Sequence, residues 1–81
     1  MSGVKGKVTD YNTGNAISGA TVTIIEDGAY AITQPDGSYL ITHGPGNFTL
    51  RADAAGYTSQ QKPVTIPATS YATVNFRLKK A

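Results

Sequence analysis

The chain contains no cysteine and no tryptophan, and its titratable groups include only one histidine and five carboxylates. Without cysteine it can form neither a disulfide framework nor a thiolate metal site, so its fold must be held by packing alone. An active site needs several titratable groups that converge on one place. So small a set predicts a protein that is not an enzyme and carries no metal and no cofactor.

Long apolar runs are also absent, and no segment approaches the roughly 20 residues that cross a bilayer. We therefore expect no membrane insertion, and Met1-Ser2-Gly3 lacks the apolar segment of a signal peptide. Charge is sparse: 15% of the residues are charged, the net charge is +2, and the cations are scattered apart from Arg77, Lys79 and Lys80. This distribution predicts no nucleic-acid partner.

What the chain does contain is typical of strands. Apolar residues make up 40% of the 81 residues, threonine, valine, isoleucine and tyrosine are abundant, and nine glycines and four prolines separate short elements. A chain of this size has room for one hydrophobic core and buries roughly 60–65% of its unfolded surface. We therefore expect a single domain over residues 1–81.

Several segments alternate apolar and polar residues with the period of two that is typical of a half-buried strand. In the clearest of them, residues 72–79, the apolar side chains of Val74, Phe76 and Leu78 share one face with Ala72. Further candidates are residues 4–8, 20–24, 29–33, 38–42, 48–52 and 64–66. Turn signals rich in glycine, asparagine, aspartate and proline separate them, and no stretch has helical periodicity. The pattern predicts an all-β, seven-stranded antiparallel β-sandwich.

Six short motifs follow one another across nearly the whole chain: Gly6-Lys-Val-Thr-Asp10, Thr13-Gly14, Ile17-Ser-Gly-Ala20-Thr-Val22, Asp36-Gly-Ser-Tyr39, Phe48-Thr-Leu50 and Ala55-Gly-Tyr57. Each is common by itself, but in order and spacing the chain resembles the carboxypeptidase regulatory-like domain family. The resemblance implies a prealbumin-like (transthyretin-like) sandwich of Greek-key type. It also implies Gly37 at a hairpin turn and a chain reversal at Gly56, after which Tyr57 folds back toward the core.

Members of that family are usually non-catalytic appendages of exported peptidases, surface proteins, outer-membrane receptors or secretion-system spikes. The resemblance therefore implies an accessory domain of a larger extracellular or cell-surface protein, acting as a structural spacer or as a docking module for a neighbouring domain or partner protein. Docking at the tip of a secretion or phage spike is a special case of this hypothesis.

Two peripheral regions are the candidate partner-binding sites, because loops and unpaired edges are the adaptable surfaces of a sandwich. Val64 and Ile66 stand between two prolines and next to Lys62, which is typical of an edge strand that could accept a partner strand. We expect Lys62 to be exposed and to guard this edge. The loops that contain Asn12, Asn15 and Asp36 form the other region.

A carbohydrate-binding module is the alternative function. Sugar-binding sandwiches stack aromatic rings on pyranose faces, and we expect Tyr39 and Tyr57 to belong to the core or its rim. The remaining candidates for sugar stacking are Tyr11, Tyr30 and Tyr71.

One residue and one segment that could suggest a site are interpreted as structural. His43 precedes Gly44 at an expected strand end, so we interpret it as a solvent-exposed structural residue. The segment that begins at Asp10 is similar to the start of a calcium loop. Asn15 and Thr21 occupy the positions where such a loop needs glycine and a bidentate glutamate, and an ordinary Asx turn is therefore expected.

Domains with this topology in collagen adhesins can carry an isopeptide bond that joins a first-strand lysine to a last-strand asparagine beside a buried acid. Lys5, Lys7 and Asn75 have suitable residue types, but Lys7 and Asn75 alternate with the apolar face, and Ala52 occupies the position of the acid. We predict no such crosslink.

The alternation over residues 72–79 yields a prediction about stability. Phe76→Ala should lower the free energy of unfolding by about 3–5 kcal/mol, because truncating a large core side chain leaves a cavity. Thr73→Ala, on the opposite face, should change it by no more than about 0.5 kcal/mol. Urea denaturation of both variants measures the difference, and equal losses would show that the faces are assigned wrongly.

Overall fold

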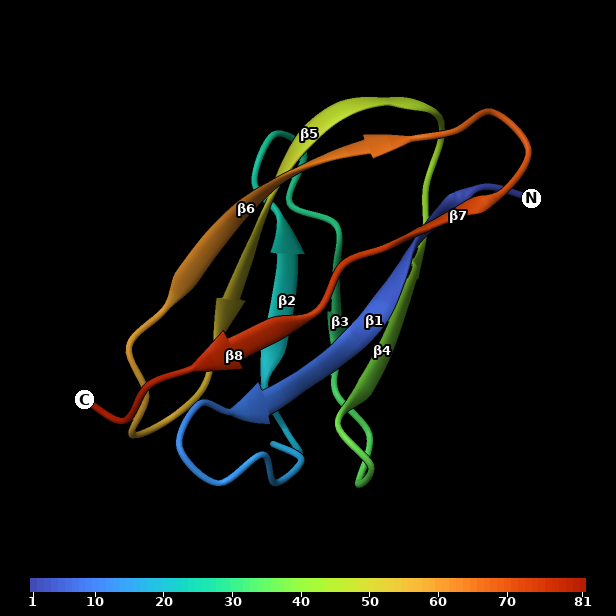
Figure 1. Cartoon of the computed structure of the whole chain (residues 1–81). Coiled ribbons are helices and arrows are strands. Elements are labelled where there is room, and N and C mark those ends of the chain that lie inside the picture. Colours follow the sequence, from blue (N-terminus) through green and yellow to red (C-terminus); the bar gives the residue numbers. More distant parts are fainter.

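The computed structural model describes all 81 residues and consists of strands and connecting loops, with no helix (Figure 1). None of its elements is therefore a helix long and apolar enough to span a membrane. The strands are β1 (Gly3–Asp10), β2 (Thr21–Ile24), β3 (Tyr30–Ile32), β4 (Ser38–Thr42), β5 (Gly46–Asp53), β6 (Gln60–Ile66), β7 (Tyr71–Thr73) and β8 (Phe76–Leu78).

Two sheets pack face to face, as expected for a β-sandwich. The first sheet has the order β4-β1-β7, with β8 also paired to β1, and the second has the order β3-β2-β5-β6. The register places Tyr71 beside Gly3 and Phe76 beside Val8, so β7 and β8 are two parts of one strand that runs along β1. Counted in this way, the predicted seven strands are present.

One pairing differs from the expected all-antiparallel arrangement. The last strand, β7 with β8, lies parallel to β1, whereas every other pair is antiparallel. The alternation of residues specifies which face is buried, but it carries no information about the direction of a neighbouring strand. The all-β sandwich class is confirmed, and this single pairing is corrected.

The core lies between the sheets and contains 14 buried apolar residues. It includes the faces predicted for β1, β2, β5 and the last strand, and Phe76 is fully buried whereas Thr73 is exposed. The members are Val4, Val8, Ile17, Ala20, Val22, Ile24, Tyr39, Ile41, Leu50, Ala52, Val64, Ile66, Phe76 and Leu78.

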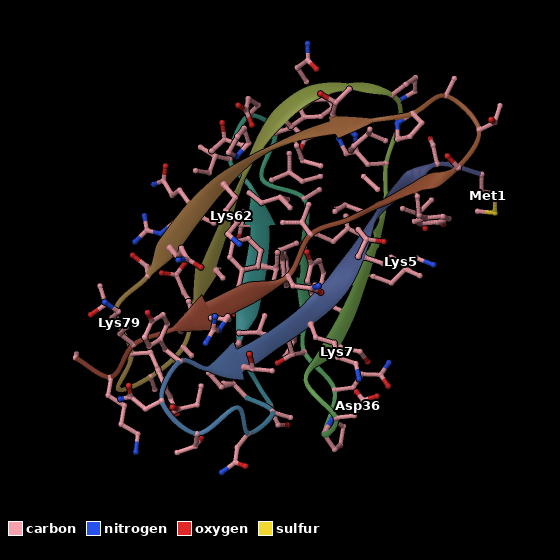
Figure 2. The ribbon with its side chains drawn as sticks, in the orientation of Figure 1. Met1, Lys5, Lys7, Asp36, Lys62 and Lys79 are labelled. Carbon is pink, nitrogen blue, oxygen red and sulfur yellow. The ribbon has the colours of Figure 1, made fainter.

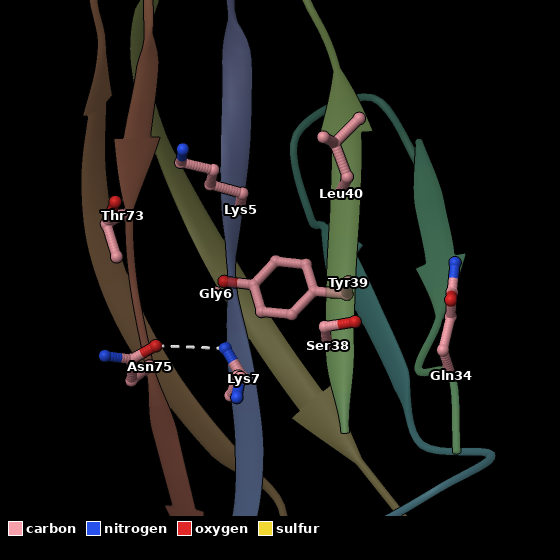
Figure 3. A pocket seen from close by; sticks show the side chains of 9 residues that line it. All are labelled: Lys5, Gly6, Lys7, Gln34, Ser38, Tyr39, Leu40, Thr73 and Asn75. Carbon is pink, nitrogen blue, oxygen red and sulfur yellow. Dashed lines mark hydrogen bonds between the residues drawn. The ribbon is translucent and has the colours of Figure 1, made fainter. Parts of the chain in front are cut away.

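The closest backbone approach in the first sheet is at Gly6 of β1. A Cβ atom at this position would lie 1.8 Å from the carbonyl oxygen of Val74, so no other residue fits without a shift of the backbone. Because Gly6 has no side chain, the ring of the facing Tyr39 in β4 lies across β1 at this point (Figure 3). The Tyr39 hydroxyl reaches the far strand and donates a hydrogen bond to the Val74 carbonyl.

This contact replaces one bond of the parallel ladder. In a regular parallel pair the Lys7 amide would donate to the Val74 carbonyl, which is instead occupied by Tyr39. The Lys7 amide donates to the Asn75 side-chain oxygen at 2.9 Å, while the Val74 amide keeps its regular bond to the Lys5 carbonyl at 2.8 Å. The Asn75 side chain therefore replaces the missing backbone acceptor for the Lys7 amide, at the break between β7 and β8.

Gly6→Ala tests this arrangement. The new methyl group must displace the Val74 carbonyl and with it the Tyr39 hydrogen bond, so we expect a loss of about 1–3 kcal/mol or more in the free energy of unfolding. Gly44→Ala is the matched control, because its added Cβ meets no atom within 4 Å and its φ is not positive. Its free energy of unfolding, measured by urea denaturation, should stay within about 0.5 kcal/mol of the parent value. Equal effects of the two substitutions would contradict the close approach.

Candidate docking surfaces

β6 is an edge strand, paired on one side only, with β5. The backbone of Thr49 in β5 faces away from β6, toward the residues that follow β2. Its amide donates to the Glu26 side chain, and its carbonyl accepts from the Ile25 amide. Its partner Pro63 therefore directs its backbone away from β5, toward the open edge. By the same alternation, Gln61 and Thr65 present backbone groups to solvent, and Pro63 interrupts the row of donors between them.

Val64, Ile66 and Lys62, which the sequence suggested as partner-binding residues of this strand, are not exposed. Val64 and Ile66 are buried in the core, so β6 can offer a partner only its backbone and its outward side chains. Lys62 was expected to be an exposed guard, but it is half-buried. Its Nζ donates to the Asn75 carbonyl at 2.6 Å and lies 5.5 Å from the centroid of the Phe76 ring. Lys62 thus closes the gap between the edges of the two sheets.

The structure brings together the two loops of the other candidate region. Asn12, Asn15 and Asp36 are all exposed. The loops meet at Ala16 and Gly37, where a Cβ built on Gly37 would lie 3.1 Å from that of Ala16. The Gly37 carbonyl also accepts a hydrogen bond from the amide of Val8 in β1.

Asp36 is organised within its own loop. Its carboxylate accepts hydrogen bonds from the Ser38 hydroxyl and amide, at 2.6 Å and 3.0 Å, and these bonds lower the pKa of Asp36.

Asp10 forms the expected Asx turn. Its Oδ1 accepts from the amides of Asn12 and Thr13, at 2.8 Å and 3.1 Å, and its Oδ2 accepts from the Tyr57 hydroxyl at 2.8 Å. These bonds, the one from Tyr57 foremost, lower the pKa of Asp10, and the same contact raises the pKa of Tyr57. Both oxygens of this buried carboxylate are occupied, and the chain contains no group of three or more histidine, cysteine or acidic side chains that could hold a metal ion.

The three tyrosines proposed for sugar stacking lie apart from one another: Tyr71 pairs with Gly3 at the start of β1, Tyr11 follows the end of β1, and Tyr30 belongs to the second sheet. Tyr11 is 43% exposed, and the cations of Arg77 and Lys79 lie 4.8 Å and 4.7 Å from its ring centroid. Tyr30, 64% exposed, projects from the outer edge of the second sheet. Tyr71 is half-buried, with its ring against Gly3 and its hydroxyl 2.9 Å from that of Thr42. The fold does not assemble them into one platform.

The outer face of the first sheet holds a shallow groove of about 580 Å³, which sequence reasoning did not identify (Figure 3). Lys5 and Lys7 of β1 line it, with the exposed Leu40 of β4 on one side and Thr73 and Asn75 of the last strand on the other. Lys7 and Asn75 face outward, as predicted, and the position where an isopeptide site would need its acid is the buried, apolar Ala52 of β5. The groove is therefore lined by two lysines, and the apolar Leu40 forms one of its walls.

His43 is less exposed than expected. Its side chain is 16% exposed, its ring packs edge-on against Phe48 with centroids 4.6 Å apart, and its Nε2 contacts the carboxylate of Asp27. Its Nδ1 lies 2.9 Å from the Gly44 carbonyl. The bond to Asp27 raises the pKa of His43 and lowers the pKa of Asp27. Asp27 belongs to the turn after β2 and His43 follows β4, so no local sequence signal connects them.

Comparisons with known proteins agree on the fold. Residues 3–79 match the sequence family described as the carboxypeptidase regulatory-like domain. No curated protein matches the chain at a significant level.

Among solved structures, two interface mutants of the type II cohesin–X-dockerin complex from Acetivibrio cellulolyticus each contain a similar chain. Their TM-scores are 0.75 and 0.79 and their identities 19% and 18%, with 91% and 96% of this chain covered. GBS52, the minor pilin of Streptococcus agalactiae, has a TM-score of 0.64 and 19% identity over 99% of this chain. The similarity extends over 51%, 57% and 45% of those chains, so this chain spans about half of their length.

The Asp27–His43 pair predicts how stability depends on pH. Because folding raises the pKa of His43 above its ordinary 6.5, the pair stabilises fully below pH 6.5, and this contribution is lost as the pH rises through the folded pKa. At the acid end, the lowered pKa of Asp27 makes its contribution present above 3.8 and lost as the pH falls through the folded value.

The NMR titration of His43, the only histidine, should therefore give a pKa above 6.5. The urea concentration at the unfolding midpoint should decrease as the pH is raised from about 6 to about 8. Asp27→Asn should flatten this dependence and return the pKa of His43 toward its ordinary value. An unshifted titration in the parent protein would contradict the contact.

Proposed function

The chain belongs to the carboxypeptidase regulatory-like domain family, and on that premise we propose that it is a non-catalytic accessory module that docks a neighbouring domain or partner protein. The similar solved chains are about twice as long as this one, which supports a role as one module among several. Two of them occur in a cohesin–X-dockerin complex and one is a pilin, which supports an extracellular or cell-surface setting. A spike tip is one such setting.

The open edge of β6 is the observation that carries this proposal. Backbone groups of Gln61 and Thr65 face solvent, and an added strand can pair with such groups through main-chain hydrogen bonds. Pro63 withholds one donor between them, so a partner strand must tolerate a gap at this position. The edge thus favours a shaped partner over indiscriminate strand pairing. The end that carries Asn12, Asn15 and Asp36 is the second place where a partner can bind.

Carbohydrate binding has less support. Stacking on a sugar chain requires aromatic rings that share one surface. Here Tyr11 is covered by two cations, Tyr71 packs on Gly3, and Tyr30 stands by itself on the other sheet.

Site-specific photo-crosslinking in the organism that encodes the chain tests the docking proposal. A photoreactive residue at Gln61 should crosslink to one defined protein, and the same residue at Thr23, on the central strand β2, should not. Thr65→Pro, which removes a second outward donor, should abolish the crosslink at Gln61. When the captured protein is added to the labelled domain, amide shifts should then move at Gln61 and Thr65. Shifts at Tyr11, Tyr30 or Tyr71 on adding an oligosaccharide would favour the alternative.

A further inference from the structure

The charges of this protein are divided between its surfaces in an uneven way. Each of the five acidic side chains already has a partner within the chain. Asp10 is bonded by Tyr57, Glu26 by the Thr49 amide and Asp27 by His43, while Asp36 is bonded by Ser38 and Asp53 by Arg51. By contrast, the ammonium groups of Lys5 and Lys7 are exposed and form no ion pair. The free charge on the outer face of the first sheet is therefore positive (Figure 2).

The cations on that face form a regular series. Lys5, Lys7 and Thr9 project outward from β1, and Arg77 of β8 pairs with Thr9. One step further in the same register, Lys79 lies beside Tyr11, whose ring it shares with Arg77. Four successive outward-facing pairs of positions on β1 and the last strand thus each hold one cation, in the order Lys5, Lys7, Arg77 and Lys79. We call this series the basic row.

The spacing of the basic row is set by strand geometry. Side chains two residues apart on one strand are roughly 6.6 Å apart, so the four cations extend over about 20 Å. An extended peptide with acidic residues at alternate positions repeats its carboxylates at the same interval. Asp36 does not occupy the row: its Oδ1 is bonded to Ser38, which lowers its pKa most, and Lys7 adds a smaller electrostatic contribution to that lowering.

We propose that the basic row binds an extended acidic segment of a partner polypeptide, with alternate carboxylates over the lysines. The groove beside Lys5 and Lys7 has Leu40, 55% exposed, as an apolar wall, and Thr73 and Asn75 as a polar one. These walls suit the apolar and polar side chains between the acids. The surface belongs to the first sheet and the β6 edge to the second, so the inference goes beyond edge docking and either can fail without the other.

A phosphate polymer fits the row less well than a peptide. Proteins that bind single-stranded nucleic acids stack bases on free aromatic rings. The aromatic residue of this row, Tyr11, already lies beneath Arg77 and Lys79.

Titration of the labelled domain with the capped octapeptide (Glu-Thr)4 tests the proposal. Amide shifts should move at Lys5, Lys7, Leu40 and Thr73 while Gln61 stays still. Binding should weaken strongly as salt rises toward about 0.5 M, because exposed charges are screened. Lys7→Gln should raise the Kd about two- to fivefold and Lys5→Gln with Lys7→Gln about tenfold, since each exposed ion pair contributes little by itself.

Two matched controls complete the experiment. Arg51→Gln removes one cation from the outer face of the second sheet and should leave the Kd unchanged, and the neutral peptide (Gln-Thr)4 should not bind. Absent shifts, shifts elsewhere on the domain, or equal losses from Arg51→Gln and Lys7→Gln would overturn the proposal. Tighter binding of a thymidine octanucleotide to the same residues would overturn the choice of a peptide and assign the face to phosphate polymers.

Discussion

The first sheet depends on the hydrogen bond that the Tyr39 hydroxyl donates to the Val74 carbonyl across Gly6. One side chain thereby connects all three strand positions of that sheet, from β4 over β1 to the last strand. The contact requires a residue without a side chain at Gly6 and a second acceptor, the Asn75 side chain, for the amide of Lys7. In a domain without disulfides, such long-range contacts must hold the last strand against the first. Burial of the Tyr39 hydroxyl raises its pKa, so it remains a donor.

The edge strand β6 is closed by a side chain toward the other sheet but keeps its own backbone open. Between β6 and the last strand, Lys62 spans from one sheet to the other and bonds the Asn75 carbonyl, so the gap is closed by a side chain. The backbone of β6 itself remains open, and Pro63 limits what can pair with it. A small sandwich cannot cover every edge, and here Pro63 protects the edge that a barrel would close. Docking at this edge would use the main chain, since the inward side chains of β6 belong to the core.

Function in such a domain resides on its surfaces, because its interior is filled with apolar side chains and its acids are engaged by turns. The acids shape loops: Asp10 and Asp36 each accept hydrogen bonds from residues that follow within three positions. The cations are left to face outward, and on the first sheet they do so at the interval of an extended chain. Asp10 and Asp36 thus organise turns, whereas Lys5 and Lys7 of β1 are exposed and form no ion pair.

Local periodicity in the sequence was enough to identify the strands, their buried faces and the turn glycines, because side chains alternate with a period of two and Gly37 meets a need for positive φ within a few residues. The motifs pointed correctly to the family and its sandwich. Only the tertiary structure decided which strands pair and in which direction. The contacts of Tyr39 with Val74, Asp10 with Tyr57, and His43 with Asp27 join residues 35, 47 and 16 positions apart. The basic row likewise exists only because a register offset of 68 residues sets Arg77 beside Thr9 and Asn75 beside Lys7. Pairing partners are selected by the packing of the whole core, and no single segment of the sequence encodes that choice.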